Sequence, residues 1–165
     1  MTKLLHITGC KNAGKTRTVE VLLPLLADRH VSVGTLKYAE RDHFDWERPG
    51  TDTDRHRLAG SRQVGILGEH SHAFGAGRSL RDIPLADILR MYYSPLDLVL
   101  IEGFHDAEGP RIEVQRTGYT DRRIGEDEGC LATYGDRILA RGVPHFAFGA
   151  EPDLVSHIMS ALELP

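Results

Sequence analysis

The stretch that decides the fold is Gly9-Cys10-Lys11-Asn12-Ala13-Gly14-Lys15-Thr16. It matches the pattern GxxxxGK(S/T) in full, and one of the chain's four lysines stands at the required place. In such a loop glycines let backbone N–H groups point inward at phosphate oxygens, and the following helix adds its positive dipole end. The lysine reaches the β- and γ-phosphates, and the hydroxyl residue binds Mg²⁺. The pattern predicts a phosphate-binding loop, whose nucleotide-binding candidates are Gly9, Cys10, Lys11, Asn12, Ala13, Gly14, Lys15, Thr16 and the adjacent Arg17.

The residues on either side of this loop have the expected periodicity. Residues 4–8 form a short apolar run, which predicts a buried strand that ends at the loop. Residues 15–29 carry apolar side chains at helical spacing, and Pro24 within them predicts a bend. The motif therefore stands where a phosphate loop belongs, between a strand and a helix.

The rest of the chain alternates between the two kinds of element. Further strands are predicted over 31–37, 64–68, 96–101, 111–116, 130–133 and 145–148, with 71–77 as an edge strand or a loop. Further helices are predicted over 53–60, 85–92, from the strand 130–133 to about residue 140, and over 152–162. This alternation predicts an α/β fold, a three-layer, mostly parallel sheet flanked by helices, of the P-loop NTPase type.

A second motif follows the most apolar strand. Residues 96–101, LDLVLI, end at Glu102-Gly103. Ligands of open α/β sheets bind at the carboxyl ends of the strands, so Glu102 is expected beside the loop, holding Mg²⁺ with Thr16 and acting with Lys15 as a catalytic group. Gly103 would allow the backbone to approach closely. The alternative is a glutamate that only begins a loop.

Composition limits the class of protein. With 41% hydrophobic and 27% charged residues, 165 residues predict one globular domain over 1–165. The net charge of −4 argues against a nucleic-acid-binding protein. Cys10 and Cys130 lie far apart and form no zinc motif. With no evident signal peptide or membrane-spanning run, we expect a cytoplasmic protein.

Two polar groups have both a functional and a structural interpretation. Asp52, Arg55 and His56 lie at helical spacing, where they would bind an anionic ligand or form surface ion pairs. Asp136 follows a predicted strand, where it would accept hydrogen bonds from guanine N1 and N2 or cap the next helix. Segment 37–62, which contains Asp52, Arg55 and His56, is polar and long for a connection. We therefore expect it to project and to help build a two-fold interface or the pocket between subunits.

Taken together, these motifs resemble the MobB family, the GTP-binding proteins of molybdopterin guanine dinucleotide biosynthesis. The resemblance rests on GCKNAGKT, VGTLK, HFDWERPGTDTDRHRLAG, LDLVLIEGF and PRIEVQR, and extends weakly to Asp136. The chain departs from the family pattern at Arg17, where a second threonine is usual, and at Thr51, where lysine is usual.

The resemblance implies a homodimeric P-loop protein that binds GTP and Mg²⁺ and assists MobA, the guanylyltransferase that joins GMP to molybdopterin. Molybdopterin itself is a further possible ligand, and weak intrinsic GTP hydrolysis is implied. Two rival functions use the same loop. A small-molecule kinase would need an acceptor site, and a metal-delivery GTPase would need a cysteine and histidine site.

Hydrolysis is expected to be slow on chemical grounds as well. An efficient GTPase needs a group that orients water and a positive charge on the developing oxyanions. The two glutamines, Gln63 and Gln115, flank or lie in predicted strands. Asp45 and Glu47 are candidates for positioning water, but they stand in a turn-rich segment. The sequence therefore predicts nucleotide binding without efficient turnover.

Overall fold

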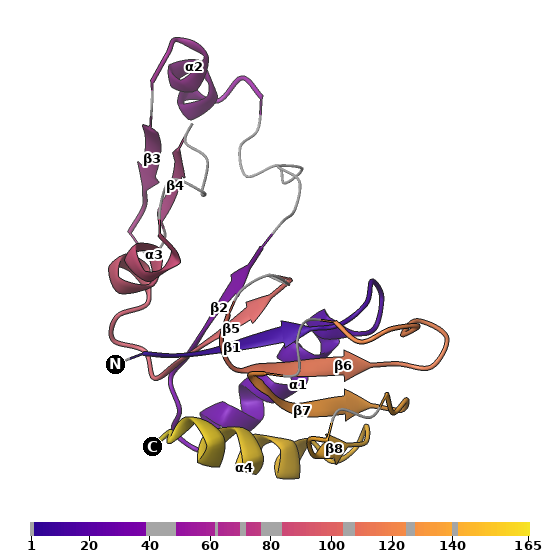
Figure 1. The fold of residues 1–165 in the computed structure, drawn as a ribbon. Coiled ribbons are helices and arrows are strands. Elements are labelled where there is room, and N and C mark those ends of the chain that lie inside the picture. Colours follow the sequence, from indigo (N-terminus) through magenta and orange to yellow (C-terminus); the bar gives the residue numbers. More distant parts are fainter. Residues whose placement is uncertain are drawn as a thin grey trace. The chain divides into compact units, whose positions relative to one another are not determined.

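The computed structural model describes residues 2–38, 49–61, 63–69, 72–76, 84–103, 108–124, 128–139 and 142–165 (Figure 1). By its internal contacts the chain divides into two compact units. Unit 1 comprises Met1–Glu40 and Tyr93–Pro165, and unit 2 comprises Arg41–Tyr92. The two units are described separately below.

Unit 1 is built on a six-stranded sheet in which every pairing is parallel (Figure 1). The strand order is β2-β5-β1-β6-β7-β8. The bounds are β1 Lys3–Thr8, β2 Val33–Lys37, β5 Leu98–Glu102, β6 Arg111–Gln115, β7 Cys130–Gly135 and β8 His145–Phe146. The α/β fold class predicted from the alternation of elements is confirmed.

One face of this sheet is apolar and is covered by two helices. Helix α1 spans Lys15–Ala27 and helix α4 spans Glu151–Leu162, and the two helices contact each other. Helix α1 continues through Pro24 and buries Leu22 and Leu26 completely. Alternate strand residues complete this core, among them Leu5, Ile7, Leu98, Leu100, Ile112 and Val114.

The opposite face of β6 is polar although it is buried. Arg111, Glu113 and Gln115 alternate with the apolar pair Ile112 and Val114, and no more than 6% of any of these three polar residues is exposed. Their hydrogen bonds reach the segments that follow β6 and β7. A parallel sheet normally buries apolar residues on both faces, so this strip of polar side chains departs from that expectation.

The described part of unit 2 contains two helices and one antiparallel pair of strands. Helix α2 spans Asp52–Leu58 and α3 spans Leu85–Tyr92, while β3 (Gln63–Leu67) and β4 (His72–Ala76) pair antiparallel. Thr51 is the N-cap of helix α2, because its Oγ1 accepts a hydrogen bond from the backbone N–H of Asp54 at 3.4 Å.

Several predicted elements differ from the structure by one or two residues at an end, and two differences have an identifiable physical cause. The helix expected from the strand 130–133 to about residue 140 is wrong: β7 continues to Gly135, and residues 136–139 are not helical. The reason is tertiary, because the side chain of Gln115 binds both the N–H and the C=O of Leu139. The last strand ends at Phe146 instead of residue 148, because residues 147–150 turn into α4.

Candidate functional site

The loop between β1 and α1 has the backbone conformation that its glycines permit. The φ angle is 142° at Gly9, 63° at Asn12 and 102° at Gly14, all in the left-handed range. A Cβ at Gly9 would lie 2.6 Å from the carbonyl oxygen of Val114. Glycine at this position therefore lets the loop pass closely over the end of β6.

Lys15 lies across the start of this loop. Its Nζ donates to the carbonyl oxygens of Gly9 and Cys10, at 2.9 Å in each case. Ala13, within the loop, is buried, and its N–H donates to the Cys10 carbonyl at 3.2 Å. The loop thus combines an ammonium group with the N-terminus of α1, and both favour a bound anion.

Thr16 and Glu102 meet beside the loop. The Thr16 Oγ1 donates to Glu102 Oε1 at 2.9 Å, and Lys37 Nζ lies 3.3 Å from the same carboxylate oxygen. Lys37 reaches it because β2 and β5 pair with Lys37 opposite Glu102. The hydroxyl and carboxylate oxygens are ligands that suit Mg²⁺. The pair therefore fits the predicted metal site, with Lys37 as an additional cation.

These residues border one pocket of about 620 Å³, a volume typical of small-molecule sites. Four of its residues were not singled out from the sequence, and they come from α1, β2 and the turn after β6. Its lining consists of Lys11, Asn12, Gly14, Lys15, Thr16, Arg17, Glu20, Lys37, Glu102, Arg116 and Tyr119. Arg17 pairs with Glu20 at 3.0 Å on the exposed side of α1. Lys37, Arg116 and Tyr119 join the pocket through the order of the strands, and local sequence motifs do not reveal that order.

Two further contacts tie the site to its surroundings. The Cys10 Sγ donates to Asp121 Oδ1 at 3.5 Å and lies 3.6 Å from the Arg122 carbonyl, so the phosphate loop touches the segment after β6. Gly103 has a φ of 91°, and a Cβ there would lie 3.0 Å from the Tyr38 carbonyl oxygen. Gly103 thus permits close backbone packing, while a direct ligand role remains a prediction.

Asp136 lies beyond β7 and does not line the pocket. Its Oδ1 accepts the backbone N–H of Thr117 at 2.7 Å, and no helix follows in residues 136–139, so the interpretation as a helix cap is wrong. Thr117 belongs to the turn that carries Arg116 and Tyr119. Asp136 is therefore joined to the pocket wall, and its role toward guanine remains a prediction.

The group on α2 lies in unit 2 and is exposed. Arg55 and Asp52 form an ion pair at 3.8 Å, and their side chains are 74% and 91% exposed. His56 is also exposed. Binding of an anionic ligand by these three residues remains a prediction. Asp45 and Glu47, proposed to position water, lie outside the described residues.

The buried acid of α2 is Asp54, which the sequence did not single out. Its Oδ2 accepts the Gly50 N–H at 2.8 Å, and its Oδ1 binds Arg57 at 2.5 Å. These bonds, the Gly50 bond first, lower the pKa of Asp54 below its usual value. Asp54 is therefore an ionised anchor for the start of α2.

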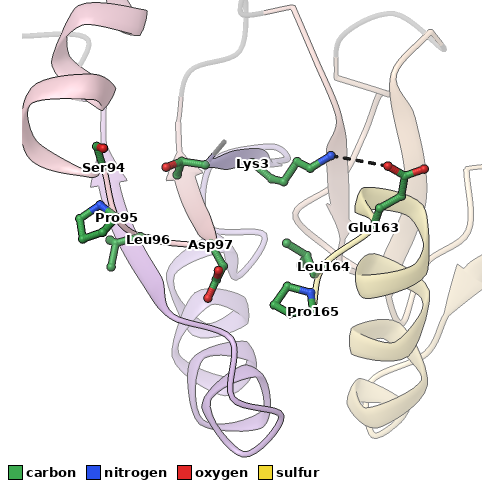
Figure 2. A pocket seen from close by; sticks show the side chains of 9 residues that line it. Lys3, Ser94, Pro95, Leu96, Asp97, Glu163, Leu164 and Pro165 are labelled. Atoms are coloured by element: carbon green, nitrogen blue, oxygen red, sulfur yellow. Dashed lines mark ion pairs between the residues drawn. The ribbon is translucent and has the colours of Figure 1, made fainter.

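A second pocket, of about 550 Å³, lies at the amino ends of the strands (Figure 2). Figure 2 shows Lys3 facing Glu163, with their charged atoms 3.8 Å apart, and Asp97 nearby. Hydrogen bonds from Ser32 lower the pKa of Asp97, first from the hydroxyl and then from the N–H. Ligands of open parallel sheets bind at the carboxyl ends, so the pocket beside Lys15 is the candidate functional site.

The parallel sheet, the glycine loop and the Thr16–Glu102 pair define a P-loop protein of the NTPase fold class. The model of the family described as "Molybdopterin guanine dinucleotide synthesis protein B" matches residues 4–136. The chain belongs to this family, MobB.

Curated relatives agree with this assignment, and a solved structure shares the fold. The molybdopterin-guanine dinucleotide biosynthesis adapter protein of Haemophilus influenzae is 32% identical over 130 residues, which are 78% of this chain and 72% of that protein. Its namesake from Escherichia coli K12 is 30% identical over 72% of this chain and 68% of its own length. The crystal structure of Bacillus subtilis MobB shares the fold with a TM-score of 0.70 and 22% identity, covering 97% of this chain and 98% of that chain.

Proposed function

We propose that this chain binds GTP with Mg²⁺ and acts as an accessory protein in the synthesis of molybdopterin guanine dinucleotide. The observation that carries the proposal is the Thr16–Glu102 contact beside a P-loop, within the matched MobB region. When bound, Mg²⁺ would neutralise phosphate charge, and Thr16 and Glu102 would hold it. Lys15 would contact the phosphates. Relatives named as adapter proteins support the accessory role.

The proposal includes the partners that an adapter requires. A MobA-type guanylyltransferase is the expected enzyme, with molybdopterin as a possible shared ligand, and the working form is a cytoplasmic homodimer. Among the described residues no helix is long and apolar enough to cross a membrane. Asp136 would read guanine N1 and N2 with its second carboxylate oxygen, since the first holds the Thr117 N–H.

The two rival functions have less support. Relatives named as biosynthesis adapters favour neither a small-molecule kinase nor a metal-delivery GTPase. Within the described ranges, no group of three or more His, Cys, Asp and Glu side chains is arranged to hold a metal ion. A P-loop in the MobB family therefore supports the accessory role best.

The test compares Lys15, at the start of α1 beside the phosphate loop, with Lys3, at the amino end of β1. Lys15→Ala should weaken GTP binding by a factor of ten or more, because a hydrogen bond to a charged group contributes about 1.5–3 kcal/mol. Lys3→Ala, at the amino end of β1, should leave GTP affinity unchanged. Calorimetric titration measures both variants. Unchanged GTP affinity in a folded Lys15→Ala protein would contradict the proposed site.

A second arm tests the accessory role. The wild-type chain should raise the yield of molybdopterin guanine dinucleotide from a MobA-type enzyme, GTP and molybdopterin, and Lys15→Ala should raise it less. Transfer of the γ-phosphate to a small acceptor, without any effect on the MobA-type enzyme, would favour the kinase alternative.

A further inference from the structure

An arginine and a tyrosine form a stacked pair on the pocket wall. The guanidinium carbon of Arg116 lies 5.1 Å from the centre of the Tyr119 ring, and both residues line the pocket of Lys15. Both are exposed, with 48% of Tyr119 accessible to solvent. The pair therefore presents a flat, polarisable surface to a ligand bound in the pocket.

The strand order indicates which part of a nucleotide would meet this pair. The phosphate loop follows β1, Glu102 ends the neighbouring β5, and Arg116 directly follows β6 on the other side of β1. Thr16 and Glu102 meet beside the loop on the β5 side, and the Mg²⁺ that we propose they hold would place the terminal phosphates toward β5. The nucleoside end then extends across β6, toward Arg116 and Tyr119.

The turn that carries the pair is held by its own hydrogen bonds. The Arg116 carbonyl accepts the N–H groups of Tyr119 and Thr120, at 3.1 and 2.8 Å, and the Arg116 N–H donates to the buried hydroxyl of Thr120 at 2.8 Å. The same turn binds Asp136 through the Thr117 N–H. The stacked pair and the proposed guanine reader thus belong to one connected surface.

We propose that Arg116 and Tyr119 form the platform on which the purine base of the bound nucleotide stacks. The inference rests on the proposed function, which supplies the nucleotide. Aromatic rings and guanidinium planes bind base faces, and this stacking tolerates different bases because every base has a π-face. The platform therefore contributes affinity for the nucleoside, and Asp136 contributes preference for guanine.

The experiment distinguishes the contribution of the base to binding from that of the phosphates. Affinities for Mg–GTP, Mg–ATP and inorganic triphosphate are measured by calorimetry on the full chain. Tyr119→Ala should weaken GTP and ATP binding by about tenfold, the usual scale of a lost base–aromatic stack, and leave triphosphate binding unchanged. Tyr119→Phe keeps the ring and should bind all three ligands like the wild type. Asp136→Ala should weaken GTP binding more than ATP binding.

Matched variants keep the outcomes distinct. Tyr92→Ala removes a tyrosine of nearly equal exposure, 47%, that does not line this pocket, and should change none of the affinities. Equal loss of triphosphate and GTP binding in a folded Tyr119→Ala protein, or no loss of either, would overturn the platform while leaving the proposed function intact. If Lys15→Ala also fails to weaken the binding of GTP or of triphosphate, the proposed function is contradicted, and the proposed platform is contradicted with it.

Discussion

At the residue scale, the Glu102 carboxylate joins two strands, β5 and β2, to helix α1. Glu102 ends β5, accepts the hydroxyl of Thr16 and lies beside Lys37. Glu102→Gln keeps the shape of the side chain and removes the charge with which we propose that Glu102 holds Mg²⁺. With Mg²⁺ present, the variant should therefore bind GTP about tenfold more weakly than the wild type. Without Mg²⁺, the two proteins should bind GTP with similar affinity.

The measurement is a GTP titration with and without Mg²⁺. Glu20→Gln is the control, because Glu20 lines the same pocket but pairs with Arg17 on the surface. A Glu102→Gln protein whose GTP affinity responds to Mg²⁺ as strongly as the wild type would show that Glu102 does not hold the metal.

His6 links a single residue to the pH dependence of folding. It is 2% exposed within β1, and burial first, then the charge of Arg111, lowers its pKa from the usual 6.5. As pH falls below about 6.5, the unfolded chain binds a proton that the folded chain rejects. The stability that neutral His6 supplies is thus complete above that pH and is lost as pH falls toward its folded pKa.

Urea unfolding at pH 7.5 and 5.5 tests this expectation. His6→Leu should lose less free energy of unfolding than the wild type between these two pH values. His56→Leu, at an exposed position of α2, should behave like the wild type. Equal losses in His6→Leu and wild type would exclude His6 as the titrating group.

At the element scale, β6 holds the segments that frame the pocket. Its Glu113 accepts the Ile124 N–H at 2.7 Å and the side-chain amide of Gln115 at 3.0 Å. Gln115 in turn binds the N–H and C=O of Leu139, at 2.8 and 3.3 Å. Both side chains are completely buried, so each lost partner leaves a costly unpaired polar group.

Gln115→Ala should therefore lower the free energy of unfolding by about 1–3 kcal/mol. It should also speed amide exchange at Leu139, because that N–H loses its acceptor. Urea unfolding and hydrogen–deuterium exchange measure the two effects. Gln63→Ala changes the chain's other glutamine, which is exposed, and should alter neither. Unchanged exchange at Leu139 in Gln115→Ala would mean that this bond does not hold the segment.

The elements that were predictable are those with local signals. Periodicity located the strand before the glycine loop, the helix after it and the apolar strand that ends at Glu102. The non-helical course of residues 136–139 was not predictable, because a glutamine from another strand competes for Leu139. Lys37, Arg116 and Tyr119 were missed for a related reason: they share a pocket only through the strand order. The pairing of strands that are distant in the sequence cannot be predicted from local sequence patterns.

At the scale of the whole molecule, we expect a homodimer to which segment 37–62 contributes. Arg55→Glu reverses an exposed charge in that segment, on a side chain that is 74% accessible, and should weaken self-association without unfolding the chain. Arg90→Glu is the matched control, because Arg90 is equally part of an exposed pair three residues apart, on α3. Light scattering at tens of micromolar, with and without GTP, measures both. A wild-type chain that is strictly monomeric in both conditions would exclude this assembly.

The whole molecule should bind GTP far better than it hydrolyses it. Hydrolysis needs a group that orients water and a positive charge on the developing oxyanions, and one missing arginine can cost about 10³–10⁵ in rate. Gln115 is buried and bound to Leu139, Arg17 pairs with Glu20, and Arg116 stacks on Tyr119.

The isolated chain should therefore release phosphate at well below about one turnover per second. Steady-state phosphate release from saturating Mg–GTP measures this rate, with Lys15→Ala as the background. A slow rate would agree with a nucleotide that acts through its presence in the pocket and not through its hydrolysis. Several turnovers per second from the chain alone would show that a water-orienting group and a catalytic cation are already assembled, and would return the kinase and GTPase alternatives to consideration.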